Sequence, residues 1–248
     1  NLEWTNEIAW DRCVNIADFE GESLPERLTA AQAALAKKGG GVVFFPAGVY
    51  RFFDSIAIEN GIVLRGADPR GETDARQESY DPPTKFEFPK YEPKREDEGT
   101  PIDSAFKGIY VSDPAATSNC GVINIAINRG HIDFKEAEGY KSGRNRIVLG
   151  CVLRNAAVAD RGVPDSKIGQ HPWQRFTARH HAAVTVKSAE NLLVANNRLP
   201  KSGEDNFTMN GYVMKGDEVF DGVVFDYDNR PGPYINDYGL GGAGGSDP

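Results

Sequence analysis

With 248 residues, the chain can form one sizeable hydrophobic core or one elongated solenoid without a second domain. Its 27 glycines, 15 prolines and 40% hydrophobic residues are typical of a turn-rich β protein. The net charge of -8 argues against general binding to nucleic acid or to anionic membranes, which need basic surfaces, and no stretch is long and apolar enough to span a bilayer.

The first elements in chain order are an arm and a helix. Residues 1–22 carry tryptophans among acidic residues and are expected to form an N-terminal arm laid over the helix that follows. Residues 23–38 predict that helix, because Ser23 and Glu26 form a capping box that satisfies the first free amides. An apolar stripe follows, and Gly39 ends the helix.

Two features bear on the compartment. The chain begins at Asn1 rather than at methionine, which agrees with a removed signal peptide and a secreted, periplasmic or extracellular protein. The cysteines Cys13, Cys120 and Cys151 are too few and too scattered for a disulfide framework or a zinc site. They are expected to be small buried hydrophobic residues.

Short β-branched or aromatic runs separated by turn residues follow the triple glycine, at 42–45, 49–53, 56–58 and 62–64. The string GGGVVFFPAGVYRF, followed by SIAIENGIVLRGA, resembles the entry segment of the pectin-lyase-like superfamily of right-handed parallel β-helices. In that family an amphipathic helix caps the first coil.

The resemblance covers about forty-five residues, and it implies an all-β, right-handed parallel β-helix with an N-terminal capping helix and long loop insertions. It says little of chemistry, because the superfamily includes lyases, hydrolases, esterases, epimerases and phage tailspikes. The interpretation is a single domain over 1–248, with β-helix coils over 39–240.

Residues 68–103 break the pattern, with many prolines and dense charges of both signs. They predict a long excursion from the solenoid, which Phe86, Phe88 and Tyr91 would pin down. Loops of this length are usually functional or disordered. The two interpretations are an ordered loop that walls one side of a cleft and a solvated charged flap.

After this loop a repeat returns. Four runs join an aliphatic segment to a polar end that closes in arginine, at 121–129, 146–154, 191–198 and 222–230. They are expected to stack in register along one axis, because no single coil of a solenoid can bury its own inner face. The pair Asn-Arg recurs at 128–129, 197–198 and 229–230 and predicts a ladder of stacked asparagines at a repeated turn.

The longest interval between these runs holds a second insertion, 160–179. That insertion and the two residues after it gather histidine, arginine and tryptophan in an acidic chain: His171, Trp173, Arg175, Arg179, His180 and His181. Lyases of the superfamily cleave uronic-acid glycans by β-elimination. The arginines would neutralise the substrate carboxylate, and one histidine would remove the neighbouring proton.

In this hypothesis Arg175 and Arg179 supply the charge, and His180 or His181 is the catalytic base. Trp173 and His171 would bind the sugar. Because adjacent residues of a strand point to opposite faces, only one of the paired histidines can line a cleft. The alternative is a loop that folds on itself, with its arginines paired to acidic residues of the same loop.

Carboxylates support a competing interpretation. The aspartates Asp205, Asp226, Asp228 and Asp237 would form the acid–base pair of a glycoside hydrolase or a Ca²⁺ site if they face one groove. Neither the polygalacturonase signatures nor the pectate-lyase motifs are present, and Gly130-His131-Ile132 is only a fragment of one of them.

The tail, 241–248, has no strand or amphipathic cap, so the open end of the β-helix is expected to meet a second chain or a missing C-terminal region. The sequence therefore predicts a polysaccharide as partner and a secreted carbohydrate-active enzyme. A lyase is preferred over a hydrolase, and a non-catalytic glycan-binding or tailspike-like module is the third alternative. No cofactor is predicted other than Ca²⁺ in the aspartate hypothesis.

Overall fold

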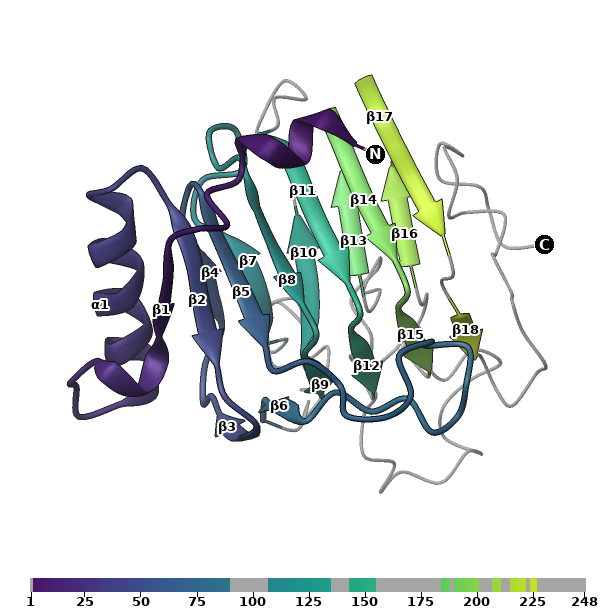
Figure 1. Cartoon of the computed structure of the whole chain (residues 1–248), viewed down its shortest axis with the longest axis horizontal. Helices are drawn as coiled ribbons and strands as arrows, with labels where there is room; N and C mark the ends of the chain where they lie inside the picture. The colour runs from purple at the N-terminus through teal and green to yellow at the C-terminus, as the bar shows by residue number, and fades with distance from the viewer. Residues whose placement is uncertain are drawn as a thin grey trace, which may run out of the picture.

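The computed structural model describes residues 2–89, 107–134, 143–154, 184–187, 190–200, 207–210, 215–221 and 224–226. Three parallel sheets run along one axis, and successive strands of the chain pass from one sheet to the next (Figure 1). The prediction of a right-handed parallel β-helix is confirmed.

Each sheet is one side of the solenoid. The seven-stranded sheet has the order β1 (Cys13–Asn15), β2 (Gly41–Phe45), β5 (Ile62–Gly66), β8 (Cys120–Ile123), β11 (Arg144–Leu149), β14 (Glu190–Ala195) and β17 (Lys215–Asp221). The six-stranded sheet has the order β3 (Gly48–Arg51), β6 (Thr84–Glu87), β9 (Ala126–Asn128), β12 (Val152–Arg154), β15 (Arg198–Pro200) and β18 (Val224–Asp226). The five-stranded sheet has the order β4 (Ile56–Ile58), β7 (Gly108–Val111), β10 (His131–Phe134), β13 (Val184–Lys187) and β16 (Phe207–Asn210).

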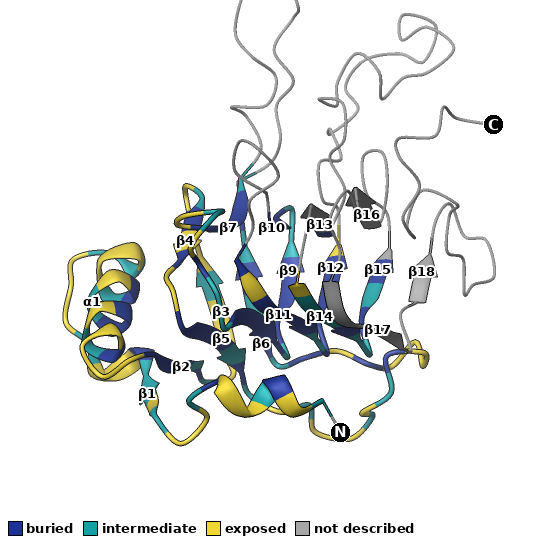
Figure 2. Ribbon diagram, turned by 90° about the horizontal axis from the view of Figure 1, so that it is seen from above, coloured by how far each residue is buried: buried dark blue, intermediate teal, exposed yellow. Residues whose placement is uncertain are grey.

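Apolar side chains stack from coil to coil inside the solenoid, where Figure 2 shows the buried residues. One such column is Val43, Leu64, Val122, Val148 and Val194. Burial of each large aliphatic side chain contributes about 1.5–3 kcal/mol. The predicted stacking holds for the first three runs.

The fourth run was wrongly placed. The next residue of this column is Phe220 of β17, which precedes the predicted run 222–230. The described part of that run, β18, pairs with β15 in the six-stranded sheet instead. The pairing of β14 with β17 also shifts its register by one residue between Glu190 and Leu192.

The capping helix α1 (Leu24–Ala36) begins as predicted. The Ser23 hydroxyl accepts from the Glu26 amide at 3.3 Å, and the Glu26 carboxylate accepts from the Glu22 amide at 2.8 Å. The return bond goes to the amide before Ser23, so it is a variant of the usual capping box. Leu28 and Leu35 face the core of the first coil, which the helix closes.

The N-terminal arm lies against this helix only in part, because β1 and η2 (Ile16–Asp18) contact α1 but the first turn of the arm lies elsewhere. Its first turn, η1 (Glu3–Glu7), places Trp4 against Val63 and Ile147 on the outer face of the seven-stranded sheet. The arm then adds β1 to the edge of β2, and both β1 and η2 contact α1, with Ile16 buried in the core. Strand pairing satisfies its backbone better than helix packing would.

Asparagines in the left-handed region turn the chain into the seven-stranded sheet. Asn119, Asn145 and Asn191 have φ of 53°, 58° and 62° and occupy equivalent corners of successive coils. The Asn191 amide donates to Asn145 at 2.8 Å, and the Asn145 amide donates to Asn119 at 2.6 Å. The predicted asparagine ladder therefore exists, but its members are different residues.

The predicted ladder positions fail because they are not in register. Asn128 lies opposite Arg154, whereas Asn197 precedes Arg198, which lies opposite Val152. The Asn197 side chain is buried and bonds the Cys151 amide and the Val148 carbonyl. The third predicted pair, 229–230, lies outside the described residues.

The excursion predicted over 68–103 is interrupted by a strand. β6 pairs with β3 and β9, and both Phe86 and Phe88 are buried in the core rather than pinning a loop. The segment before it, 67–83, lies across the six-stranded sheet, and we call it the strap. Tyr80 of the strap donates to the Gly150 carbonyl at 2.7 Å, and Ala75 donates to the Asn196 side chain at 2.8 Å. Tyr91 lies outside the described residues.

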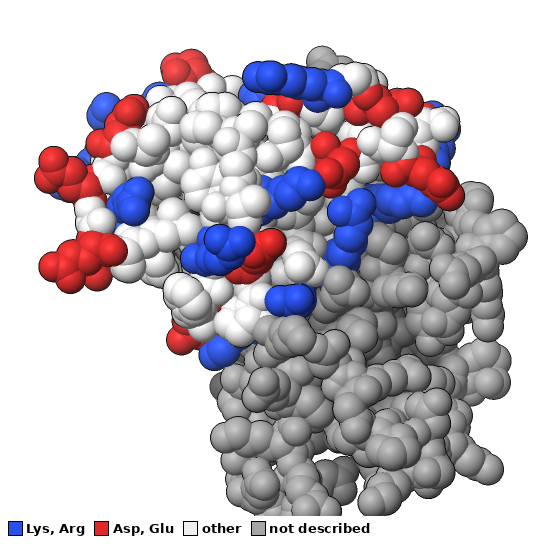
Figure 3. Space-filling view, turned by 90° about the horizontal axis from the view of Figure 1, so that it is seen from below, with Lys and Arg blue, Asp and Glu red and all other residues white. Residues whose placement is uncertain are grey.

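The strap reaches successive coils of the solenoid. Ala75 and Tyr80 cover Ala126 and Val152 on the outer face of β9 and β12. In the view of Figure 3, acidic and basic side chains lie next to each other. Among the ion pairs of the strap, Asp81 contacts Lys85 at 2.6 Å and Arg154 at 3.3 Å. Within the described residues, no helix has both the length and the apolar character needed to cross a membrane.

Candidate functional site

The side chains predicted to carry the chemistry are not described. His171, Trp173, Arg175, Arg179, His180 and His181 lie outside the described residues, as do Asp205, Asp228 and Asp237. Asp226 ends β18, but only its backbone is described. The lyase and aspartate hypotheses for these residues stay predictions. Val184, the first described residue after the histidines, pairs with Ile132 of β10.

Two polar side chains of β10 lie next to the pair that Ile132 forms with Val184. Ile132 and Phe134 point into the core, so His131 and Asp133 lie on the outer face of the five-stranded sheet. Their exposed fractions are only 2% and 4%. Tyr110 of β7 is half-buried and lies opposite Asp133. We call His131, Asp133 and Tyr110 the β10 cluster.

The histidine of the cluster is held by its neighbours on β7. The imidazole meets the Tyr110 ring edge to face, with ring centroids 5.1 Å apart and an interplanar angle of 87°. A Cβ atom on Gly108 would lie 2.9 Å from His131 Nδ1 and 2.4 Å from the His131 carbonyl oxygen. The lack of a side chain at Gly108 therefore leaves the space in which the imidazole sits.

These three residue types can perform proton transfer. An imidazole accepts a proton near neutral pH, a phenol can donate one, and a carboxylate can orient and stabilise the charged imidazole. Buried titratable groups on the outer face of a sheet are unusual, because the hydrophobic core lies on the other side.

Sequence reasoning missed this cluster because Gly130-His131-Ile132 was compared with a hydrolase motif rather than read as part of a strand. The signal was the alternation in His131-Ile132-Asp133-Phe134, which puts both polar residues on one face and both apolar residues on the other. The partner Tyr110 could not be found in this way, since its pairing depends on a coil twenty residues away.

The described residues offer little for a metal ion. No group of three or more histidine, cysteine, aspartate or glutamate side chains is close enough to hold one among them. The aspartates of the calcium hypothesis lie outside this part of the chain or are described only by their backbone.

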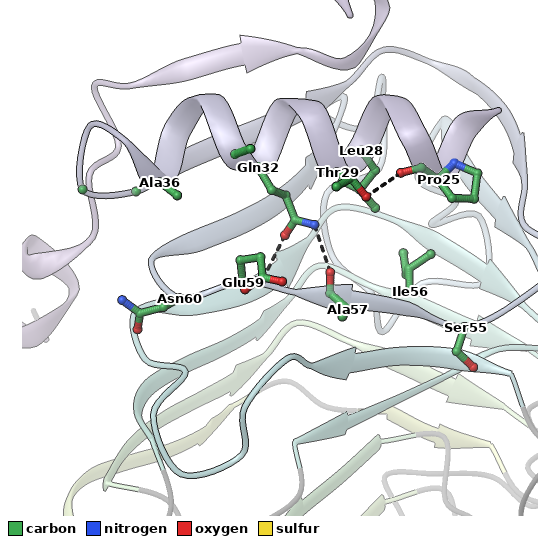
Figure 4. A pocket seen from close by; sticks show the side chains of 13 residues that line it. Pro25, Leu28, Thr29, Gln32, Ala36, Ser55, Ile56, Ala57, Glu59 and Asn60 are labelled. Carbon is green, nitrogen blue, oxygen red and sulfur yellow. Dashed lines mark hydrogen bonds between the residues drawn. The ribbon is translucent and has the colours of Figure 1, made fainter. Parts of the chain in front are cut away.

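A separate pocket of about 510 Å³ lies between α1 and β4 (Figure 4). Leu28, Ala36 and Ile56 are among its apolar lining residues, and Glu59 is its one titratable side chain. The Gln32 side chain crosses from the helix to the β4 backbone within it. An acid–base pair is not available there, so the β10 cluster is the better candidate site.

Comparison with known proteins finds similar solved structures but no family. No family model matches the chain, and no curated protein matches it. The A-module of the mannuronan C-5 epimerase AlgE4 of Azotobacter vinelandii is similar over 87% of this chain and 52% of its own, with 15% identity and a TM-score of 0.46. The AlgE6 A-module of the same organism is similar over 74% and 43%, with 14% identity and a TM-score of 0.41.

An iota-carrageenase solved with iota-carrageenan fragments is similar over 84% of this chain and 45% of its own, with 14% identity and a TM-score of 0.30. The chain thus spans about half the length of these structures. The three parallel sheets by themselves define the class of the fold, that of parallel β-helix proteins.

Proposed function

We propose that the protein is a carbohydrate-active enzyme that acts on a polysaccharide, with the β10 cluster as its proton-transfer group. The observation that carries this proposal is the edge-to-face contact of His131 with Tyr110, 5.1 Å between ring centroids, beside the buried Asp133. The sheets of a parallel β-helix form extended faces, which suit a chain of sugars rather than a small ligand. An extracellular location is part of the proposal.

The finer proposal is β-elimination on a uronic-acid glycan. His131 removes the proton next to the substrate carboxylate, the electron pair forms the new carbon–carbon double bond, and the glycosidic carbon–oxygen bond breaks. Tyr110 donates a proton to the departing sugar oxygen. A nearby cation must neutralise the substrate carboxylate for this proton to be acidic enough.

The predicted His-Arg residues would supply that cation. Arg175 and Arg179 precede β13 in the chain, and β13 is the strand that pairs with β10. The proposal therefore joins the two halves of the site, the β10 cluster as acid and base and the arginines as carboxylate binders. It rests on chain order and strand pairing.

The test is a product analysis on a panel of acidic and neutral polysaccharides, with the purified protein. Elimination creates an unsaturated sugar that absorbs in the near ultraviolet, and we expect this absorbance to appear with an acidic glycan. New reducing ends without the absorbance would replace the lyase by a hydrolase. Binding without any new ends would contradict an enzyme and favour a glycan-binding module.

A further inference from the structure

We propose that Arg146, a buried arginine of β11, is a positioning residue that holds the two strands of the β10 cluster in place and supplies a fixed positive charge behind it. This inference rests on the proposed function of that cluster. Nothing in the sequence pattern singles out Arg146, since it lies within an otherwise ordinary aliphatic run.

The first observation is where the side chain lies. Ile147 packs on the outer face of the seven-stranded sheet and Val148 lies in the core, so Arg146 also points inward. Its exposed fraction is 0%, and it is the first of the largest fully buried side chains in the described residues. In the stack of coils it lies between Cys120 and Leu192. Arginine is almost never buried so fully unless its charge is used.

The second observation is what the guanidinium touches. Its Nη1 donates to the Phe134 carbonyl at 3.1 Å, and its Nη2 donates to the Pro114 carbonyl at 3.0 Å. The guanidinium carbon lies 5.5 Å from the centroid of the Phe134 ring. Arg146 thus crosses the interior of the solenoid to the five-stranded sheet.

One of these carbonyl groups lies at the end of β10, and the other lies shortly after the end of β7, the two strands that carry the cluster. Phe134 is the last residue of β10 and directly follows Asp133. Pro114 is three residues beyond Val111, the end of β7, which carries Tyr110. One planar, forked side chain therefore fastens both strands, and it fixes their relative position at the end nearest Asp133.

The third observation is the charge around it. The titratable groups described near the guanidinium are Cys120 of β8 and Asp133 of β10. Burial lowers the pKa of Arg146, while its electrostatic interactions with Cys120 and Asp133, each in its ionised form, oppose that shift. Burial also raises the pKa of Cys120 to about 11, so this thiol is neutral at physiological pH. Asp133 is then the negative partner of the buried cation.

Stability alone does not explain an arginine here. Replacing a buried charge by a well-packed apolar residue is often neutral or stabilising, and the neighbouring positions in the same column are Cys120 and Leu192. A leucine or methionine would continue the core. Only an arginine can donate hydrogen bonds to both carbonyl groups at once. In our proposal its positive charge also lowers the proton affinity of Asp133 and His131.

The test compares Arg146→Met, which removes both fork and charge, with Arg146→Lys, which keeps the charge. Arg154→Met, the same change at an exposed arginine of the same coil, is the control. The titration of His131 is followed by NMR of the imidazole Cε1–H group, and His131→Gln identifies its signal among the four histidines. The kcat and KM are measured on the glycan that the product analysis identifies.

We expect Arg146→Met to raise the His131 titration midpoint by about one pH unit and to lower kcat at least about tenfold, with KM within about twofold. Arg146→Lys should leave the midpoint nearly unchanged but still lower kcat, because a lysine cannot hold both carbonyl groups. Arg154→Met should change neither. A merely structural arginine would lower the unfolding temperature without moving the His131 midpoint or kcat.

Folded Arg146→Met with an unchanged midpoint and kcat would overturn the inference. If this variant does not fold, Arg146→Lys decides, since an unchanged kcat in that variant would also overturn it. Failure of the proposed function looks different, because then His131→Gln itself retains full turnover. If His131→Gln is inactive while the Arg146 variants behave as wild type, only the positioning role is wrong.

Discussion

The side-chain amide of Gln32 pairs with β4 as a residue of a parallel strand would. Its Nε2 donates to the Ala57 carbonyl at 3.0 Å, and its Oε1 accepts from the Glu59 amide at 2.9 Å. β4 is the end strand of the five-stranded sheet, so its outer edge would otherwise expose backbone groups that invite pairing with another chain. One side chain of α1 thus closes part of that edge.

Gln32→Met, which keeps the length of the side chain but not its hydrogen bonds, should lower the free energy of unfolding by about 1–3 kcal/mol. Two backbone groups in the pocket then lose their partners. Denaturant unfolding measures the change, and Gln77→Met on the exposed strap is the control, expected within about 0.5 kcal/mol of wild type. Equal stability of the two variants would show that the Gln32 contacts contribute nothing.

The asparagine ladder should depend on both its amides and its backbone conformation. Asn145→Gly loses the bonds to Asn119 and Asn191 and the contact with Glu7 at 3.1 Å, and we expect a loss of about 2 kcal/mol. Asn145→Ala should lose about 1 kcal/mol more, because its φ of 58° suits glycine and asparagine but strains alanine. If alanine were tolerated better than glycine, the left-handed corner would not be the reason for asparagine here.

Gly150, in the turn between β11 and β12, should be irreplaceable for steric reasons. Gly150 has a φ of 64°, and an added Cβ would lie 2.2 Å from the Asn124 side-chain oxygen and 2.9 Å from the Tyr80 hydroxyl. Gly150→Ala should therefore lower the unfolding free energy by about 3 kcal/mol or more and loosen the strap. Gly71→Ala has a φ of 111° but no atom within 4 Å of its Cβ, so it tests strain without the clash. Limited proteolysis of the strap should distinguish the two variants.

Buried thiols should make the protein less stable in alkali. Burial raises the pKa of Cys120 to about 11 and that of Cys151 to about 12, from 9.0. Between pH 9 and these values the unfolded thiols ionise while the native ones keep their protons. The unfolded state then binds fewer protons, and the free energy of unfolding falls as the pH rises, by up to about 1.4 kcal/mol per pH unit for each thiol.

Unfolding measured from pH 8 to 11 in two single variants tests this prediction. Cys151→Ala should flatten the decline with pH by about the contribution of one thiol. Cys13→Ala is the control and should leave the slope unchanged, because Cys13 is exposed rather than buried as the sequence predicted. Identical slopes in wild type and in Cys151→Ala would contradict the account.

The helix and the strands of the first coil could be predicted because their signals lie within a few neighbouring residues. The Ser23 cap, the helix and the strands of the first coil follow from caps, periods and turns, and the later aliphatic runs do stack. The sequence did not show where the strap ends and β6 begins. The alternation of Phe86 with Phe88 fits a strand, and it also fits a loop held down by aromatic side chains. Only the partners β3 and β9 decide between them.

The sequence could not predict the register, that is, which residues of successive coils lie opposite one another. The Asn-Arg pairs looked equivalent, but coils of different length place Asn128 and Asn197 at different corners, so the ladder formed elsewhere. The same limit concealed the β10 cluster, in which Tyr110 and His131 come from different coils. The burial of Arg146 could not be predicted for another reason. An arginine within an aliphatic run is expected to point to solvent, and only its contacts with the Phe134 and Pro114 carbonyl groups show that it points inward.

The most direct test of the central claim is the turnover of His131→Gln on the glycan that gives unsaturated products, with folding checked by circular dichroism. We expect a loss of about 100- to 10,000-fold, the usual contribution of a general base, and a comparable loss for Tyr110→Phe. Tyr50→Phe, whose hydroxyl bonds the Pro46 carbonyl in the first coil, is the matched control and should keep full turnover. Full turnover of folded His131→Gln would contradict the assignment of the β10 cluster as the catalytic group.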